Sequence, residues 1–338
     1  MKLHLGIDVG FSRTKGTGSD GKQTDFISQI APFEPVKFVS NVKDIPYSQR
    51  MVVSYNSEKF FVGESAGKQS LPSATIQRTR TVNREGELLL LGAMGNLIDN
   101  SPEHINLVVG LPVSNLDLKD KYIEMASGKH TFTLLELDGS YRKEITVSVD
   151  NIACLPQPFG SLFDSVLDNR GQFIASAVAA GNVGILDIGY GTTDFLRSLN
   201  LEFKNKLSCS VEGIGGFMIA QTLSNLIYDK YQERIQIEDI DPYVKGADLM
   251  LNGEVIKLTE LRKQSFKMSA EAILSRLVSL WPDLNRLDLI IITGGASLLI
   301  GDYLAGRLGK MALVVTDPVF SNAKGYLKYS LMKWGGRQ

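Results

Sequence analysis

The sequence predicts an α/β protein that is built from two related domains. Its 338 residues exceed the length at which one hydrophobic core stops growing, so two domains are expected. Short apolar runs typical of buried strands alternate with stretches of helical periodicity, as in sheets covered by helices on both faces. A segment near the N-terminus also recurs, with matching residue types, near the middle of the chain. Such a repeat is expected when two domains share one architecture.

The strands are predicted from short runs of aliphatic and β-branched residues. The first run ends at Val9-Gly10, and the next begins near Arg13. Asn56-Ser57-Glu58 is a short turn that predicts a hairpin. The expected strands cover residues 3–9, a stretch from about 13, 25–30, 51–55, 59–62, 105–109, 131–137, 143–149, 184–188, 287–293 and 312–315.

The helices are predicted where apolar residues recur at spacings of three and four. Pro156 and Pro158 mark the entry to one helix, and glycines precede another at Phe217. The expected helices cover residues 85–98, a stretch after Asn115, a stretch ending near 169, 217–231, 259–280, 298–308 and 322–332. We expect domain I at residues 1–155, to which a C-terminal helix at 323–338 returns, and domain II at residues 156–322.

Composition and charge limit the class of protein. Lys and Arg total 36 against 37 Asp and Glu, so the sequence has no excess of basic residues. A broad nucleic-acid-binding surface is therefore not expected, and we expect any contact with DNA to be made through an adaptor. Asp8 interrupts the N-terminal apolar stretch, which argues against a signal peptide, and no run reaches the ~18 apolar residues of a membrane span. The two cysteines, Cys154 and Cys209, suit a reducing compartment. We expect a soluble, cytoplasmic protein without membrane contact.

The internal repeat contains the candidate functional residues. Asp8-Val9-Gly10-Phe11 and Asp187-Ile188-Gly189-Tyr190 each follow an apolar strand and share the order Asp, aliphatic, Gly, aromatic. Each copy then reaches a threonine at the same offset, Thr14 and Thr193. One Asp-x-Gly occurs by chance in many proteins, but two copies with matching flanks, each at the start of an expected domain, indicate a shared function.

The residue types suit phosphate and magnesium. A tight turn of glycine and small hydroxyl residues after a strand points backbone N–H groups into one concavity, which binds an anion. Asp8 and Asp187 cannot meet phosphates without repulsion, but they can hold Mg²⁺ through its retained waters. Lys15 can reach a phosphate as a compact positive charge. Glycines at turns and strand ends without any function are the simpler alternative.

Two further glycine motifs extend this prediction. Thr293-Gly294-Gly295-Ala296 follows a buried strand, and its glycines would let the backbone approach a base or a ribose. Gly213-Ile214-Gly215-Gly216 precedes a helix, whose N-terminus favours an anion. Ordinary turns would explain either motif alone.

Arg78-Thr79-Arg80 is expected to form a solvated surface, with filament or adaptor contacts as the alternative.

These motifs, in this order, resemble the superfamily of actins, sugar kinases and heat-shock chaperones over nearly the whole chain. The resemblance implies two actin-like (ribonuclease H-like) domains with a nucleotide cleft between them. Residues 8–16 resemble the first phosphate loop and 187–194 the second, while 293–297 resemble the adenosine motif. Residues 155–160 and 317–326 resemble the two connecting segments.

Within that superfamily the chain resembles the bacterial and archaeal ParM/StbA-type plasmid-segregation actins. The resemblance rests on Gly110-Leu111-Pro112, on residues 187–195 and on Asn322-Ala323-x-Gly325. It implies an ATPase that polymerises with ATP, depolymerises after hydrolysis, and contacts plasmid DNA through an adaptor protein. Phe11, Ser12 and Arg13 depart from the small residues common in the first loop, which puts the contacts of Ser12 and Arg13 in doubt.

The resemblance assigns roles residue by residue, with ATP and Mg²⁺ as cofactors. Gln157 would orient the attacking water, because an amide cannot deprotonate it. Asp187 would act in catalysis, and Asp8 and Asp187 would hold the metal through water. Thr192 and Thr193 would donate hydrogen bonds to phosphate. The nucleotide-binding residues implied are Asp8, Gly10, Ser12, Arg13, Thr14, Lys15, Gly189, Gly191, Thr192, Thr193, Gly215, Gly216, Gly294, Gly295 and Ala296.

Two other functions are open to the same fold. A small-molecule kinase needs a carboxylate base for the substrate hydroxyl, and residues 156–160 offer Gln157 in place of one. A chaperone-like or pilus-assembly nucleotide switch would bind ATP without polymerising. Chaperones append a substrate-binding domain, whereas this sequence ends at Gln338, soon after the last expected helix.

Overall fold

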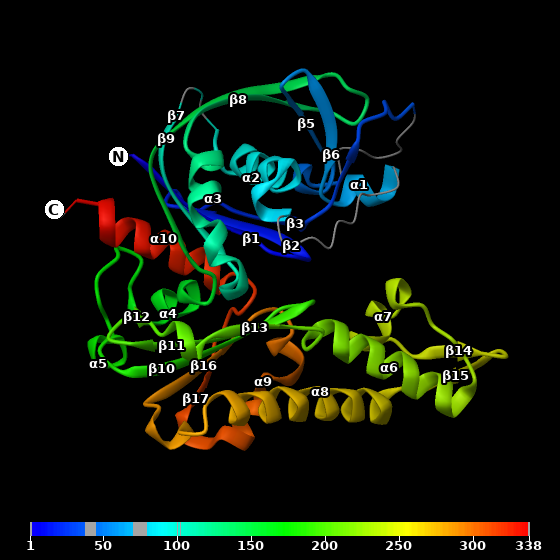
Figure 1. Ribbon diagram of the computed structural model, residues 1–338. Helices are drawn as coiled ribbons and strands as arrows, with labels where there is room; N and C mark the ends of the chain where they lie inside the picture. The colour runs from blue at the N-terminus through cyan, green and yellow to red at the C-terminus, as the bar shows by residue number, and fades with distance from the viewer. Residues whose placement is uncertain (1, 38–44, 70–79, 100, 102, 337–338) are drawn as a thin grey trace. The chain divides into compact units, whose positions relative to one another are not determined.

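The computed structural model (Figure 1) describes residues 2–37, 45–69, 80–99, 101 and 103–336. The chain divides into two compact units. Unit 1 comprises Met1–Ser176 and Phe320–Gln338, and unit 2 comprises Ala177–Val319. Within the described ranges, no helix combines the length and the apolar character that a membrane span requires.

Unit 1 is built on a mixed sheet with the strand order β3-β2-β1-β7-β9-β8-β5-β6-β4. β1 runs antiparallel to β2 and parallel to β7, and β7 is parallel to β9. The strands are β1 (Leu3–Val9), β2 (Arg13–Gly18), β3 (Gln23–Ile27), β4 (Ile30–Pro32), β5 (Met51–Tyr55), β6 (Glu58–Val62), β7 (Glu103–Leu111), β8 (Gly128–Leu135) and β9 (Tyr141–Pro156).

The helices of unit 1 pack apolar faces on this sheet. Leu88–Leu91 of α2 are buried in the same core cluster as Leu5 and Ile7 of β1. The Asn83 side chain caps α2 by accepting from the backbone N–H groups of Glu85 and Gly86, at 2.9 and 3.3 Å. The helices are α1 (Glu64–Gln69), α2 (Arg84–Leu97), α3 (Lys119–Ala126), α4 (Phe159–Val166) and α10 (Ser321–Trp334), with a 3₁₀ turn at Arg80–Val82 before α2.

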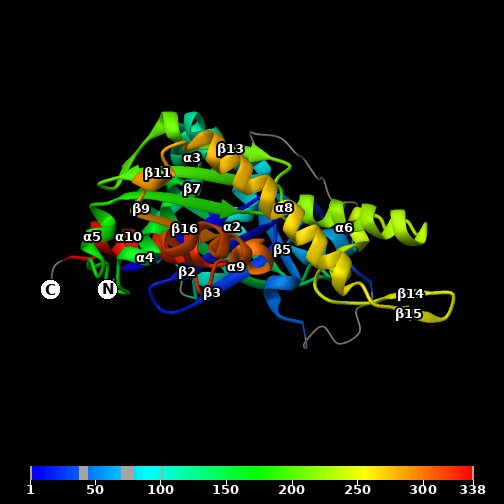
Figure 2. The same ribbon diagram turned by 90° about the horizontal axis from the view of Figure 1, so that it is seen from below.

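Unit 2 has a smaller mixed sheet with the order β12-β11-β10-β16-β17, and β13 also pairs with β11. Trp281 lies at its core, fully buried against Phe195. The strands are β10 (Asn182–Ile188), β11 (Thr192–Leu199), β12 (Glu202–Phe203), β13 (Cys209–Glu212), β14 (Leu249–Leu251), β15 (Glu254–Ile256), β16 (Leu289–Thr293) and β17 (Ala312–Val314). The helices are α5 (Ser176–Ala179), α6 (Gly216–Tyr231), α7 (Asp241–Val244), α8 (Thr259–Leu280) and α9 (Ser297–Leu308). Figure 2 shows α6 and α8 side by side.

The two units repeat one architecture, which confirms the fold class. The order β3-β2-β1-β7-β9 of unit 1 corresponds strand for strand to β12-β11-β10-β16-β17 of unit 2. In each series the first two pairings are antiparallel and the last two are parallel. The register agrees as well, because Asp8 lies opposite Lys15 and Asp187 lies opposite Asp194. The sequence repeat is therefore a repeat of local structure.

The unit boundaries differ from the domain boundaries expected from the sequence. Residues 156–176 were assigned to domain II, but they belong to unit 1, and the return to unit 1 begins at Phe320. The physical reason is the packing of α4 against α10, where Gly160 and Gly325 let the two helices approach closely. No sequence pattern within 156–176 reveals which core that helix covers.

Two elements also end earlier than predicted. The strand expected at 25–30 stops at Ile27, because the Gln29 N–H turns back to donate to the Ile27 carbonyl at 2.8 Å, and a separate strand, β4, begins at Ile30. The helix expected to reach residue 169 stops at Val166. Asp168 there accepts hydrogen bonds from the backbone N–H groups of Arg170 and Gln172, both at 2.8 Å, which is a turn that competes with the helix.

Candidate nucleotide-binding site

The first turn, residues Gly10–Arg13, joins β1 to β2 and has all its carbonyl groups occupied. The Gly10 N–H donates to the Arg13 carbonyl at 3.1 Å. The Ser28 hydroxyl donates to the Gly10 carbonyl, and the Ser28 N–H donates to the Ser12 carbonyl, both at 2.8 Å. The Arg80 guanidinium donates to the remaining one, the Phe11 carbonyl, at 2.8 Å.

The second turn, residues Gly189–Thr192, joins β10 to β11 and is closed in the same way. The Gly189 N–H donates to the Thr192 carbonyl at 2.9 Å. The other three carbonyls accept backbone N–H groups from the segment around the start of α6. These bonds are Gly216 to Gly189 at 3.0 Å, Phe217 to Tyr190 at 2.7 Å and Gly213 to Gly191 at 2.9 Å.

Both turns consequently present hydrogen-bond donors. Within the described part of the chain, the N–H groups of Phe11 and Ser12 have no acceptor, and the same holds for Tyr190 and Gly191. Phe11 and Ser12 are exposed, as is Tyr190, so a ligand can reach these groups. A turn whose carbonyls are all bonded and whose N–H groups are available attracts an anion and does not repel it.

Asp8 lies at the end of β1, beside the first turn, and is 2% exposed. Its carboxylate accepts a hydrogen bond from Gln157 Nε2 at 2.8 Å and lies 3.6 Å from Lys15 Nζ. Burial raises the pKa of Asp8, while Lys15 and hydrogen bonds from Gln157 and Asn322 oppose that rise. The structure thus brings Gln157, predicted from residues 155–160, together with Asp8 and Lys15, predicted from residues 8–16.

Gln157 is held in place by its backbone. Its N–H donates to the Leu111 carbonyl at 2.7 Å, and its carbonyl accepts from the Tyr326 hydroxyl at 3.0 Å and from the Gly160 N–H at 3.1 Å. Because Nε2 faces the Asp8 carboxylate, Oε1 is the amide atom available to accept a hydrogen bond from a water.

Asn322 is a site residue that the sequence analysis did not assign. Its Oδ1 accepts from the Ser161 hydroxyl at 2.8 Å and the Ser161 N–H at 3.1 Å, and its side chain hydrogen bonds to Asp8. Asn322 therefore links α4 and α10 to Asp8. Its position in the Asn322-Ala323-x-Gly325 string was the one signal in the sequence that pointed to it.

Asp187 occupies the equivalent place at the end of β10 in unit 2 and is 7% exposed. Gly294, with a φ of +86°, passes so close that a Cβ there would lie 2.5 Å from Asp187 Oδ1. The Ala296 N–H donates to the Ile188 carbonyl at 3.0 Å, which fixes the glycine motif against the second turn. Gly295 is exposed, with open space where a side chain would be. An open glycine of this kind permits close approach by a flat group.

Several predicted binding residues use their polar groups within the fold. Arg13 pairs with Asp25 at 2.6 Å and with Glu64 at 3.3 Å, so its guanidinium is directed to carboxylates. The buried Thr14 hydroxyl bonds to the Ser28 hydroxyl at 2.9 Å.

In unit 2 the same is true of the residues around the second turn. Thr193 donates to the Ile214 carbonyl at 2.6 Å, and Thr192 is the more exposed of the two threonines. The N–H groups of Gly216 and Phe217 donate to carbonyls of the second turn, so these two N–H groups support that turn and are not available to an anion.

A Mg²⁺ site fits these side chains only through water. Among the residues that the structure describes, no three His, Cys, Asp or Glu side chains gather into a metal-binding group. Asp8 is buried and already hydrogen bonded, which disfavours direct coordination. Mg²⁺ that keeps several waters needs few protein ligands, and a single carboxylate, that of Asp8 in unit 1 or that of Asp187 in unit 2, could accept hydrogen bonds from those waters. When bound, the ion would neutralise phosphate charge.

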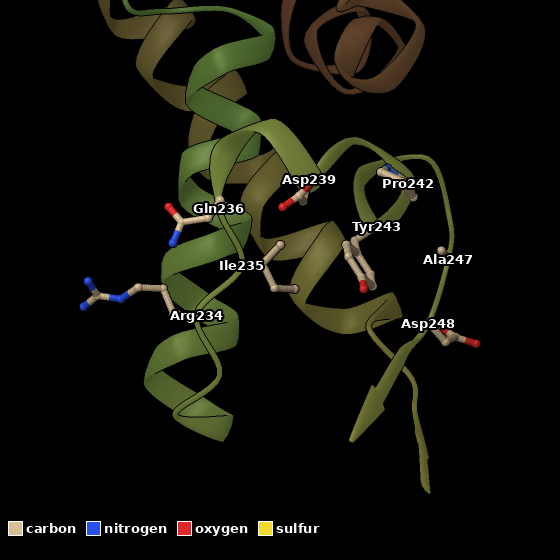
Figure 3. A pocket seen from close by; sticks show the side chains of 8 residues that line it. All are labelled: Arg234, Ile235, Gln236, Asp239, Pro242, Tyr243, Ala247 and Asp248. Atoms are coloured by element: carbon tan, nitrogen blue, oxygen red, sulfur yellow. The ribbon is translucent and has the colours of Figure 1, made fainter. Parts of the chain in front are cut away.

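A separate hollow of about 480 Å³ lies in unit 2 (Figure 3). It is formed where the chain leaves α6, by α7 and by the segment before β14. Its lining contains none of the predicted site residues. The lining residues are Arg234, Ile235, Gln236, Asp239, Pro242, Tyr243, Ala247 and Asp248.

We expect Asp8→Asn to stabilise the protein in the absence of any ligand. The raised pKa of Asp8 means that its ionised form costs folding free energy at neutral pH. The isosteric amide removes that cost, and we expect a gain of about 1 kcal/mol in chemical denaturation at pH 7. As the pH falls through the raised pKa, Asp8 of the wild type becomes protonated and the free-energy cost of its ionised form disappears. The stability gain of Asp8→Asn over the wild type should therefore shrink in acid. A variant less stable than the wild type at pH 7 would contradict this account.

Comparison with known families agrees with the fold. Residues 6–160 match the family described as actin like proteins, N terminal domain. Residues 185–306 match the family described as archaeal actin homologue MreB-like, C-terminal. The chain is therefore an actin-like protein.

The chain is similar in sequence to archaeal actin homologues and in fold to ParM. It is 26% identical over 337 residues to an archaeal actin homolog of Thermoplasma volcanium, covering 95% of this chain and 97% of that protein. A 15-stranded ParM filament from Clostridium botulinum has a TM-score of 0.78 at 24% identity, covering 97% and 99%. Bacillus thuringiensis ParM with AMPPNP has a TM-score of 0.75 at 18% identity, covering 98% and 99%.

Proposed function

We propose that this actin-like protein binds Mg·ATP, hydrolyses it, and polymerises into filaments that assemble with ATP and disassemble after hydrolysis. Transport of plasmid or other DNA through a DNA-bound adaptor is the role we propose for the filaments, in a cytoplasmic setting. The ParM relatives, one described as a filament and one with AMPPNP, support this proposal.

One observation carries the proposal of phosphate binding. The first and second turns have every carbonyl bonded inside the fold, and each leaves two backbone N–H groups without an acceptor among the described residues. The same arrangement arises from different donors in the two units, so it is not a by-product of one local sequence. We propose that each turn binds phosphate oxygens of ATP through these N–H groups.

The proposed chemistry of hydrolysis depends on Gln157 and the acidic residues. Gln157, held by its backbone and by Asp8, would accept a hydrogen bond from the attacking water through Oε1. An amide is a weak base, so it would orient the water and not deprotonate it. Phosphoryl transfer responds mainly to positioning and charge stabilisation, which makes such a residue sufficient. A sugar kinase would need a carboxylate to accept the proton of the sugar hydroxyl. The adjoining segment 158–163 contains no Asp or Glu.

The experiment that tests this function compares purified protein with Mg²⁺ and ATP, ADP or a non-hydrolysable ATP analogue. Light scattering and pelleting report polymer, and a phosphate assay reports hydrolysis. We expect polymer with ATP that decays as phosphate is released, longer-lived polymer with the analogue, and little polymer with ADP. Nucleotide binding without polymer over a wide concentration range would contradict the filament and favour a monomeric switch or a kinase, which a substrate screen would separate.

A further inference from the structure

The two turns are supported in different ways at one position. In the second turn the Tyr190 carbonyl accepts a backbone N–H, that of Phe217, and the Tyr190 ring lies edge-on to the Phe217 ring at 6.3 Å. In the first turn the equivalent carbonyl is that of Phe11, and no backbone N–H among the described residues reaches it. The Arg80 side chain bonds to it instead.

Arg80 contacts the first turn through several groups at once. Its guanidinium donates to the Phe11 carbonyl at 2.8 Å and also to the Ser28 carbonyl. The guanidinium carbon lies 5.7 Å from the centroid of the Phe11 ring, within the range of a cation–π interaction. Ser28 in turn bonds to two other carbonyls of the turn, so Arg80 and Ser28 together hold its acceptor side.

Arg80 is itself fixed by the beginning of α2. Its Nε donates to Glu85 at 2.6 Å, and the Arg80 and Glu85 side chains are 12% and 6% exposed. Glu85 is part of the first helical turn, whose N–H groups are capped by Asn83. The sequence analysis expected residues 78–80 to form a solvated surface, which is wrong for Arg80, while Arg78 and Thr79 lie outside the described residues.

We propose that Arg80 is the positioning residue of the first turn: by holding the Phe11 carbonyl, it keeps the Ser12 N–H, which belongs to the same peptide plane, directed to phosphate. The proposal rests on the proposed binding of ATP. If the Phe11 peptide were free to rotate, it would present a carbonyl oxygen where the anion binds, which repels phosphate. Arg80 thereby does with a side chain what the start of α6 does with its backbone in the second turn. The same contact gives the large Phe11 side chain a role at a position where small residues are common, because the Phe11 ring packs against the Arg80 guanidinium.

The test measures equilibrium binding of ATP, ADP and AMP by calorimetry for the wild type, Arg80→Ala and Arg80→Lys. We expect Arg80→Ala to bind ATP and ADP about tenfold more weakly, with a smaller change for AMP, which has fewer phosphates to meet the turn. Arg80→Lys should not restore affinity, because an ammonium lacks the planar fork that contacts both carbonyls.

Arg84→Ala is the matched control. Arg84 also stacks on an aromatic ring, that of Tyr55 at 4.8 Å, bonds to the Tyr55 carbonyl at 3.1 Å and pairs with Glu87 at 3.1 Å. Among the described residues, Arg84 makes no hydrogen bond, ion pair or ring contact with the first turn, so its loss should lower the unfolding temperature without changing the ratio of ADP to AMP affinity.

The outcomes separate the two proposals. If the wild type binds ADP and Arg80→Ala binds it equally well, the positioning role is wrong and the nucleotide site stands. A parallel loss for all three nucleotides, matched by Arg84→Ala, would mean that Arg80 is merely structural, and recovery in Arg80→Lys would mean that charge alone suffices. Failure of the wild type to bind any nucleotide would overturn the proposed function and this inference with it.

Discussion

Replacing Asp187 with alanine is expected to abolish Mg-dependent ATP hydrolysis. Asp187 ends β10 beside the second turn, is 7% exposed and lies against Gly294. In the proposed function it holds Mg²⁺ through water, and the ion neutralises charge on the phosphates. Loss of several kcal/mol of that stabilisation corresponds to a fall in kcat of at least about a hundredfold. The measurement is phosphate release under saturating ATP, with and without Mg²⁺.

The control for this prediction is Asp288→Ala in the same sheet. Asp288 precedes β16 and accepts the Asn182 N–H at 2.7 Å, at the end of β10 opposite to Asp187. That variant should unfold at a lower temperature yet keep the Mg²⁺ dependence of hydrolysis. Normal turnover by a folded Asp187→Ala variant would show that the metal is held elsewhere.

The repeat made the centres of both units predictable from sequence. Asp8 and Asp187 each follow a buried strand and precede a glycine turn, so local pattern alone placed them at equivalent positions, which the matching registers bear out. The sequence also predicts a mostly helical stretch at 259–280, and the structure has a single helix with those bounds, which no Gly or Pro interrupts. Short-range signals of this kind do not depend on the rest of the fold.

The residues that hold the first turn could not be found in the same way. Ser28 and Arg80 reach Gly10–Arg13 from other parts of the chain, and neither belongs to a pattern that indicates its partner. Arg80 looked like a surface arginine because its neighbours are polar, whereas Glu85 and the Phe11 ring bury it. Likewise, Thr14 and Thr193 match a phosphate-binding motif in sequence, but their hydroxyls satisfy buried acceptors. Long-range contacts decide such cases.

The crossing of α4 and α10 also escaped the sequence analysis, and it leads to the largest expected effect on stability. We expect Gly325→Ala to destabilise unit 1 by about 3 kcal/mol or more. A Cβ at Gly325 would overlap the carbonyl oxygen of Gly160 and lie 2.8 Å from the Asp164 backbone nitrogen. Those atoms belong to the backbone of α4 and cannot move without separating the helices, which would also displace Asn322 and Gln157 from Asp8.

Helix propensity acts in the opposite direction, because alanine favours a helix over glycine by about 1 kcal/mol. Gly306→Ala in α9 isolates that term, since Gly306 is exposed and nothing lies within 4 Å of a Cβ there. We therefore expect chemical denaturation to show Gly306→Ala equal to or more stable than the wild type and Gly325→Ala much less stable. If both variants gained stability, α4 and α10 would have to lie further apart than Gly160 and Gly325 indicate. That result would also contradict the connection from α10 through Asn322 to Asp8.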